Sequence, residues 1–192
     1  MNPSASKEKA PRGKSFKKRY GNLVLLCLLL PLFYFFVIGG MQFFKVPSSS
    51  MENTLMPGDY LLTLKVSEYS HGDIVVLRDT SGAGGHLVKR IVAMEGDQVA
   101  AWGGALLVNG RYLSEPYIRE PLLYEINPPI TVPEGQVFLL GDNRNESDDS
   151  HLSGKGYPVE DIVGKVRYRY LPAARRGPIA SYPARVASPA EE

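Results

Sequence analysis

Short apolar stretches alternate with turn-forming residues over most of this chain of 192 residues, and the pattern predicts a mostly β domain. Turn formers such as Pro57-Gly58-Asp59 and Glu95-Gly96-Asp97 separate the apolar stretches. Asn109-Gly110, between Leu107-Val108 and Tyr112-Leu113, predicts a two-residue hairpin. No long apolar period of 3.6 residues occurs in this part of the sequence. The predicted strands are residues 61–66, 73–78, 87–94, 105–108, 131–132, 136–140 and 163–170.

One long apolar run near the N-terminus interrupts this pattern. Residues 21–44 contain no Asp, Glu, Lys or Arg. At ~1.5 Å of rise per residue, a helix of this length crosses the ~30 Å hydrocarbon layer of a membrane, and Pro31 would kink it without excluding it. Residues 1–20, in contrast, are rich in Lys and Arg. Because basic flanks stay in the cytoplasm, the sequence predicts a single-pass protein of the cell membrane with a cytoplasmic N-terminus.

A cleaved secretory signal peptide is the alternative interpretation of this N-terminal region. The apolar part of such peptides is about 7–15 residues long and ends at a small-x-small site. The run is longer here, and residues 37–42 offer no alanine-type site. The sequence therefore favours an uncleaved transmembrane helix over residues 21–44 and a compact extracytoplasmic β-rich domain over residues 45–172. Residues 173–192 turn to Pro, Ala, Arg and Ser, which predicts a mobile tail.

Composition narrows the chemistry that this domain can perform. Its size and 44% hydrophobic content suit one folded domain. The net charge is only +2, and the basic excess lies beside the apolar run without a helix-turn-helix pattern, so membrane lipid is an expected partner and nucleic acid is not. The single cysteine, Cys27, falls inside the run, which leaves the domain without a disulfide or a thiol nucleophile. His71, His86 and His151 are scattered, so neither a metal nor another cofactor is expected.

A cluster of three serines, Ser48 to Ser50, directly follows the apolar run. A serine hydroxyl is a poor nucleophile and needs a base. Lys89 is the candidate, because alternation along a strand places it on one face with Leu87 and Ile91. Apolar surroundings lower the pKa of a lysine, and a neutral amine can accept the serine's proton. From spacing alone, an ordinary surface or snorkelling lysine is the more common arrangement.

Several short motifs follow the apolar run in a fixed order. The motifs are Pro47-Ser48-Ser49-Ser50-Met51 with Thr54-Leu55, then Gly58-Asp59, Gly72-Asp73-Ile74-Val75-Val76, Lys89-Arg90 with Gly96-Asp97, and Gly141-Asp142-Asn143-Arg144 with Ser147 and Asp149-Ser150. In this order they resemble the type I signal peptidases, also called leader peptidases, over roughly residues 44–171. One such motif would be weak evidence, whereas the ordered series is specific.

The resemblance implies a membrane-anchored serine endopeptidase that removes signal peptides from exported preproteins after small-x-small sites. It assigns Ser50 as the nucleophile and Lys89 as the general base, with an acyl-enzyme intermediate. Ser48 matches a hydroxyl of the oxyanion hole, and Ser147 matches the hydroxyl that orients the lysine. The resemblance also implies a polar network that holds the walls of the site, formed by Arg90, Asp142, Arg144 and Asp149.

Apolar residues near the serines and the lysine are expected to hold the substrate peptide. An extended peptide can pair with exposed strand edges while its small side chains enter shallow pockets. For any one of these residues, simple core packing is nearly as good an explanation. The expected substrate-binding residues are Phe44, Val46, Pro47, Met51, Leu55, Leu87 and Val88.

The chain departs from the family pattern in places, and other functions stay open. Asn53 stands where proline is common, and His151 stands where many members have an arginine that pairs with the acid matching Asp149. The partners of Asp149 are therefore not predicted. A conjugation-type processing protease of the same superfamily is one alternative function. A membrane-anchored β domain that binds a partner without cutting it is the other.

Overall fold

The computed structural model describes residues 16–38, 40–80, 84–182 and 185–186, arranged in two compact units that divide after Ile38. Helix α1 (Phe16–Ile38) belongs to the first unit, and every described strand belongs to the second. Most of the predicted basic segment, including residues 1–15, lies outside the described residues. The second unit is mostly β, as the sequence predicted.

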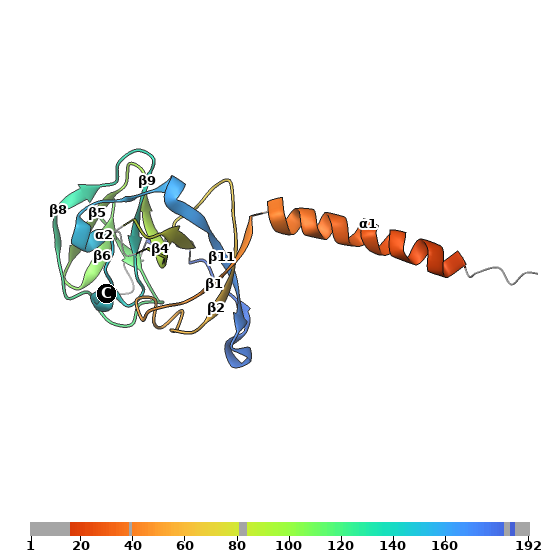
Figure 1. Cartoon of the computed structure of the whole chain (residues 1–192). Helices are drawn as coiled ribbons and strands as arrows, with labels where there is room; N and C mark the ends of the chain where they lie inside the picture. Colours follow the sequence, from red (N-terminus) through yellow and green to blue (C-terminus); the bar gives the residue numbers. More distant parts are fainter. Residues whose placement is uncertain (1–15, 39, 81–83, 183–184, 187–192) are drawn as a thin grey trace, which may run out of the picture. The chain divides into compact units, whose positions relative to one another are not determined.

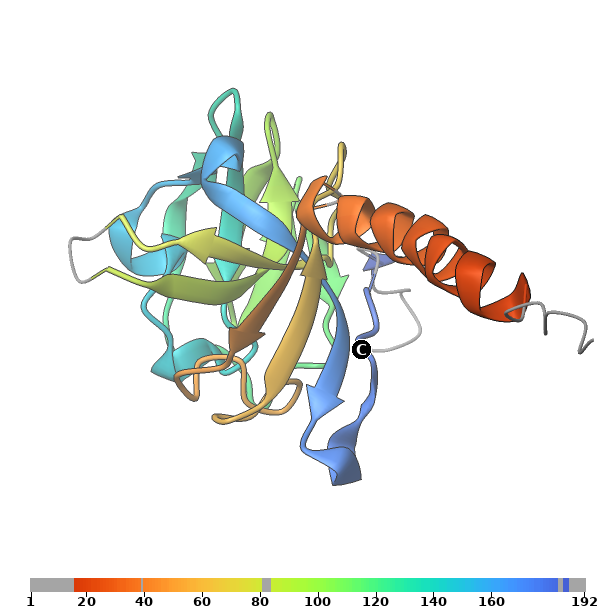
Figure 2. The same ribbon diagram turned by 45° about the vertical axis from the view of Figure 1, so that its right-hand side comes forward.

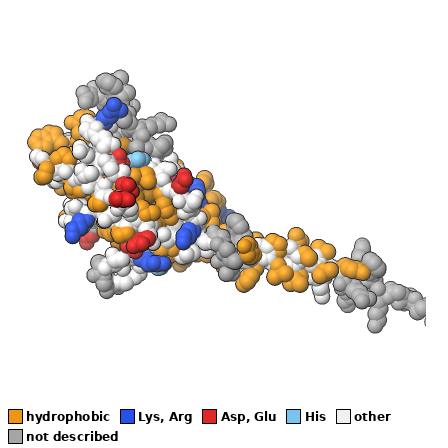
Figure 3. Space-filling model, turned by 90° about the horizontal axis from the view of Figure 1, so that it is seen from above, with side chains coloured by type: hydrophobic (Ala, Val, Ile, Leu, Met, Phe, Trp, Pro, Cys, Tyr) orange, Lys and Arg blue, Asp and Glu red, His pale blue; other side chains and the backbone are white. Residues whose placement is uncertain are grey.

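Helix α1 has three basic residues near its start, at positions 17–19, is apolar from Leu23 onward and contains Pro31. The large apolar side chains described between residues 20 and 36 are exposed, with Leu28 at 67% and Phe33 at 65% of full exposure. Figure 3 shows hydrophobic side chains along the visible face of this helix. Within the described residues, no helix meets the combined length and apolarity that a membrane crossing requires.

The chain changes from helix to strand earlier than the apolar run suggested. Helix α1 ends at Ile38, and β1 (Met41–Lys45) pairs antiparallel with β2 (Tyr60–Leu64). Gly40 precedes β1 with φ of +64°, and a Cβ at this position would overlap the Cβ of Lys65. The predicted helix over residues 21–44 is therefore corrected at its end. Uncharged residues suit a membrane helix and a paired strand equally well, so apolarity alone does not mark the boundary.

Two antiparallel sheets form the β unit (Figure 1). The larger has the order β1-β2-β11-β3-β4-β9-β10, with β12 beside β11, and the smaller has the order β13-β7-β6-β5-β8. The short helices η1 (Arg144–Glu146), α2 (Ser150–Ser153), η2 (Val159–Asp161) and η3 (Ala173–Arg175) lie between successive strands of the larger sheet. The remaining strands are β3 (Ile74–Arg78), β4 (His86–Met94), β5 (Gln98–Trp102), β6 (Ala105–Val108), β7 (Arg111–Ser114), β8 (Ile126–Thr131), β9 (Gln136–Leu140), β10 (Tyr157–Pro158), β11 (Ile162–Leu171), β12 (Gly177–Pro178) and β13 (Arg185–Val186).

The predicted hairpin and most predicted strands are confirmed. Asn109 and Gly110 connect β6 to β7 with φ of +53° and +73°, the left-handed values that a tight two-residue turn requires. Strands β5 and β8 were not predicted as such. Strand β8 contains Pro128 and Pro129, which oppose strand formation locally, but it lies at the edge of its sheet beside β5.

Strand β4 contributes to all three hydrophobic clusters of the core. Val92 and Ala93 belong to the first cluster, Val88 to the second and Ile91 to the third. Burying one large apolar side chain contributes about 1.5–3 kcal/mol, so the position of this strand is strongly determined. The two residues of β4 between Val88 and Ile91 are Lys89 and Arg90, and both are buried.

The C-terminal segment differs from the predicted mobile tail where the structure describes it. Helix η3 is followed by β12, which pairs with β11. Ser181 Oγ donates a hydrogen bond to Asp73 Oδ1 over 3.0 Å, and the ring of Tyr182 lies 5.3 Å from that of Tyr117. Composition failed as a guide because this segment is held by backbone pairing, arginines and one aromatic ring rather than by an apolar core of its own. Residues 187–192 lie outside the described part.

Candidate active site

The serines lie in a closed loop, residues 46–59, which we call the serine loop. Its ends are joined by hydrogen bonds from Val46 N to Asp59 O and from Gly58 N to Val46 O, at 2.8 and 2.9 Å. Met51 and Leu55 are buried in the second core cluster and hold the loop from below. The serine side of the loop is thereby left at the surface.

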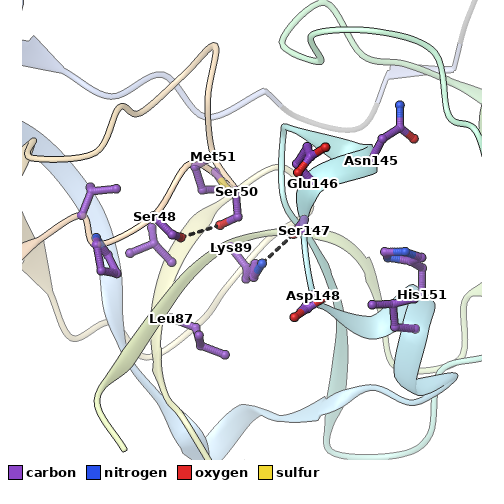
Figure 4. A pocket seen from close by; sticks show the side chains of 14 residues that line it. Ser48, Ser50, Met51, Leu87, Lys89, Asn145, Glu146, Ser147, Asp148 and His151 are labelled. Carbon is purple, nitrogen blue, oxygen red and sulfur yellow. Dashed lines mark hydrogen bonds between the residues drawn. The ribbon is translucent and has the colours of Figure 1, made fainter. Parts of the chain in front are cut away.

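A pocket of about 510 Å³ lies beside the serine loop, bounded also by β4 and by the segment that follows β9 (Figure 4). Ser48, Ser50, Lys89 and Ser147 all line it, so the fold brings together the four predicted catalytic residues from three separate parts of the chain. The predicted substrate-binding residues among its lining are Val46, Pro47, Met51, Leu87 and Val88.

The remaining two predicted substrate-binding residues are not among those that line the pocket. Leu55 is fully buried in the second core cluster. Phe44 packs against that cluster and lies 4.8 Å from the ring of His86. Both side chains therefore support the serine loop and β1, as the core-packing alternative expected.

Lys89 is enclosed, with a relative exposure of 3%. Its Nζ donates a hydrogen bond of 2.6 Å to Ser147 Oγ and lies 4.0 Å from Asp149 Oδ2. Burial lowers the pKa of the lysine, and this effect outweighs the carboxylates of Asp149 and Asp148, which act in the opposite direction. The site thus favours the neutral amine more than water does.

The serine side of the pocket is held by the segment after β9. Asn143 N donates to Ser50 O over 3.1 Å, and Asn143 Nδ2 donates to Ser49 O over 3.2 Å. Ser48 Oγ donates to Ser50 Oγ over 3.4 Å. In Figure 4 the lysine amine points to Ser147, and no hydrogen bond joins it to Ser50 among the described side chains.

A relay of hydrogen bonds runs from the lysine through Ser147 and Asp149 to His151, which also lines the pocket. Ser147 Oγ donates to Asp149 Oδ2, which also accepts from Gly141 N at 2.8 Å. Asp149 Oδ1 lies 2.6 Å from Nδ1 of His151. Burial would raise the pKa of Asp149, but the hydrogen bonds from His151 and Ser147, the nearby lysine and the Gly141 amide together lower it. The carboxylate therefore stays ionised and aligns Ser147.

The predicted polar network consists of separate pairs in the structure. Arg90 donates from Nε and Nη2 to both oxygens of Asp142 at 2.8 and 2.7 Å, and its guanidinium lies 3.9 Å from the ring centre of Tyr117. Thr54 Oγ1 of the serine loop donates to the same carboxylate. This pair therefore connects β4 to the serine loop.

Arg144, in contrast, pairs with an acid that the sequence analysis missed. It donates from both terminal nitrogens to Glu115, and its Nε donates to Gly141 O over 3.0 Å. Glu115 follows β7 and is far from Arg144 in sequence, so no local pattern marks the pairing. The bond to Gly141 lies within the segment after β9, and the pair with Glu115 joins this segment to the end of β7.

Gly141 itself was quoted only as part of a motif, and its role follows from close approach. A Cβ there would overlap both Ser147 Oγ and the carbonyl oxygen of Ser50. Only glycine lets these two segments lie so close together. The Gly-Asp sequence directly after an apolar strand was the feature of the sequence that could have indicated this close approach.

Comparisons with known proteins agree with the motifs. The family described as "Signal peptidase, peptidase S26" matches residues 18–171. This chain belongs to that family. The resemblance expected from the motifs is confirmed, and with it the predicted class of enzyme, a serine endopeptidase of the signal peptidase type.

Individual relatives cover most of the chain. It is 38% identical over 183 residues to a probable signal peptidase I-1 of Synechocystis sp., a match that covers 90% of this chain and 91% of that protein. It is 36% identical over 163 residues to a signal peptidase I of Bacillus licheniformis, covering 78% and 83%. Thylakoidal processing peptidase 1 of Arabidopsis thaliana is 38% identical over 162 residues, which cover 71% of this chain and 47% of that protein.

Proposed function

We propose that this protein removes signal peptides from exported preproteins with Ser50 as the nucleophile and Lys89 as the general base. The carrying observation is a buried lysine with a lowered pKa that lines the same pocket as the serine, in a chain of the signal peptidase family. In the described residues, no cluster of His, Cys, Asp and Glu suits a metal ion, so the proposal uses side-chain chemistry alone.

The proposed first step is acyl transfer. Neutral Lys89 has one lone pair and two N–H bonds, and one of these N–H bonds is directed to Ser147. Its lone pair accepts the hydroxyl proton as Ser50 Oγ attacks the scissile carbonyl. The protonated amine then gives this proton to the leaving amino group, so the C–N bond breaks and an ester to Ser50 remains. A water molecule, deprotonated by the same lysine, hydrolyses that ester.

Ser48 is proposed as a donor to the oxyanion that forms during both steps. Its hydroxyl lies 3.4 Å from Ser50 Oγ and faces the pocket, which supports this role. Loss of one oxyanion donor costs about 10²–10³-fold in turnover in other enzymes. Ser48→Ala should therefore slow cleavage by roughly this factor without changing the dependence of the rate on pH.

Helix α1 is proposed to be a membrane anchor that keeps the enzyme next to its substrates. Its exposed apolar side chains and the absence of Asp, Glu, Lys and Arg from residues 21–38 support this role. In intact cells, a tag after Glu192 should then be open to external protease, while a tag before Met1 should be protected. The opposite accessibility would exclude the proposed topology.

The test of the function is cleavage of a preprotein by the full chain, with sequencing of the product's new N-terminus. Cleavage is expected after a small-x-small site and should be lost in Ser50→Ala. Ser49→Ala is the matched control, because it removes a neighbouring hydroxyl while leaving the carbonyl that Asn143 holds. Cleavage that survives Ser50→Ala, or an intact chain that binds preproteins without cutting them, would refute the proposal.

A further inference from the structure

The C-terminal strap, residues 172–182, lies just beyond the part of the chain that matches the family, which ends at residue 171. Figure 2 shows this segment, in blue, turning back after β11 and running beside it. Strand β12 pairs with β11, and Ile179 N donates to Arg167 O over 3.1 Å. Ile179 also packs against the core cluster that holds the serine loop. The strap is therefore a packed part of the domain.

At its start the strap reaches the base of the serine loop. Arg175 donates from Nε, over 3.2 Å, and from Nη2 to Oδ1 of Asp59. Asp59 is fully buried, and its Oδ2 accepts from Met56 N at 2.9 Å and from Arg169 at 3.2 Å. A buried carboxylate needs such partners, because its transfer from water is otherwise costly. The strap thus completes the surroundings of the residue that closes the loop.

At its other end the strap reaches the Arg90–Asp142 pair, which also holds the serine loop. The ring of Tyr182 lies 5.3 Å from that of Tyr117 and 5.5 Å from the guanidinium of Arg90. Arg90 holds Asp142, the carboxylate that accepts a hydrogen bond from Thr54 of the serine loop. An aromatic face near a desolvated guanidinium favours its position. Two independent chains of contacts therefore run from the strap to the loop.

We propose that the strap is a positioning element for the serine loop, with Arg175 and Tyr182 as the residues that hold Ser50 in its reactive position. Neither residue is among those that line the pocket, so both act through the loop's supports. The proposal rests on the proposed function for its kinetic consequence only. The loop's dependence on the strap is a property of the fold and can be measured without substrate.

The first test is amide hydrogen exchange of the full chain in detergent. Arg175→Ala and Tyr182→Ala should each speed exchange at the amides of residues 46–59, while the amides of β9 keep their protection. Tyr182→Phe retains the ring and should restore slow exchange. Arg176→Ala, a change of the exposed neighbouring arginine, is the matched control for Arg175→Ala. Unchanged exchange in the loop, or equal acceleration throughout the domain, would overturn the proposal.

The second test is preprotein cleavage by the same variants. Loss of the loop's position should lower kcat roughly tenfold, since small misplacements of reacting groups are costly, while KM changes by less than about twofold. The pH dependence should stay as in the parent, because the surroundings of Lys89 are intact. A change in KM alone would overturn the positioning role. If the parent chain cuts no preprotein, the proposed function fails, and hydrogen exchange still decides the role of the strap.

Discussion

Strand β4 carries two adjacent basic residues whose side chains lie in different surroundings. Lys89 and Arg90 are both buried, at 3% and 0% exposure. The lysine amine meets a hydroxyl and stays 4.0 Å from its nearest carboxylate oxygen, whereas the guanidinium binds Asp142 with two hydrogen bonds and covers the ring of Tyr117. The charge of Lys89 is therefore only partly compensated by carboxylates, whereas the charge of Arg90 is compensated by a direct ion pair.

This difference separates a reactive group from a structural one. Burial disfavours the charged lysine by more than the carboxylates of Asp149 and Asp148 favour it, so its pKa falls and a usable base results. An arginine cannot be deprotonated in a protein, so full pairing makes it a fixed connection between β4 and the serine loop. Four predictions test the contrast, in order of decreasing effect.

The largest effect is expected from changing the lysine to the other type of cation. Lys89→Arg should reduce cleavage by about 10²–10⁴-fold, because a guanidinium stays protonated and a general base contributes a factor of this size. The measurement is single-turnover cleavage of a preprotein, with circular dichroism to verify folding. Near-normal turnover in this variant would contradict the role of Lys89 as base.

The second effect is on stability and concerns the arginine. Arg90→Met should lower the free energy of unfolding by about 3–5 kcal/mol, because Asp142 would remain buried without its charge partner. Urea unfolding of the variant and the parent measures this difference. Arg90→Lys, which keeps one charge without the forked geometry, should lose less. Equal stability of Arg90→Met and the parent would show that the pair does not support the fold.

The third prediction concerns pH. If Lys89 must be neutral, kcat/KM should rise with pH, about tenfold per unit below the folded pKa of the lysine, and level off above it. Because burial lowers this pKa, the plateau should begin below the ordinary lysine value of ~10.4. In His151→Gln, kcat/KM should rise with pH in the same way, and the midpoint of the rise should shift only slightly. Loss of this rise in kcat/KM with pH in the His151→Gln variant would mean that the histidine is the base.

The smallest expected effect is a change in stability that has the opposite sign for Lys89→Met and for Arg90→Met. Lys89→Met should raise the free energy of unfolding at neutral pH by on the order of 1 kcal/mol, because it removes an under-compensated buried charge. In the parent, the folded pKa lies below the unfolded one, so stability is lower below the folded pKa and recovers as pH rises toward ~10.4. The difference in the urea midpoint of unfolding between Lys89→Met and the parent should therefore become smaller in alkaline buffer. A Lys89→Met variant less stable than the parent would mean that neighbouring groups compensate the buried charge of Lys89 as well as Asp142 compensates that of Arg90.

Local sequence patterns were sufficient for the β class, the strand that carries Lys89 and the turn at Asn109-Gly110. These features depend on the alternation of neighbouring side chains and on backbone conformations that few residues adopt. The ordered motifs also identified the family, and they named Ser50, Lys89 and Ser147, which line one pocket from three distant segments.

Only the tertiary structure decided which partners these residues have. Arg144 pairs with Glu115 rather than joining the Arg90 pair, Leu55 enters the core rather than the pocket, and the strap packs although its composition predicted a mobile tail. Each of these outcomes depends on contacts between residues far apart in the chain. Sequence determines which side chains are present and how they alternate, whereas burial and charge compensation arise only when distant segments meet.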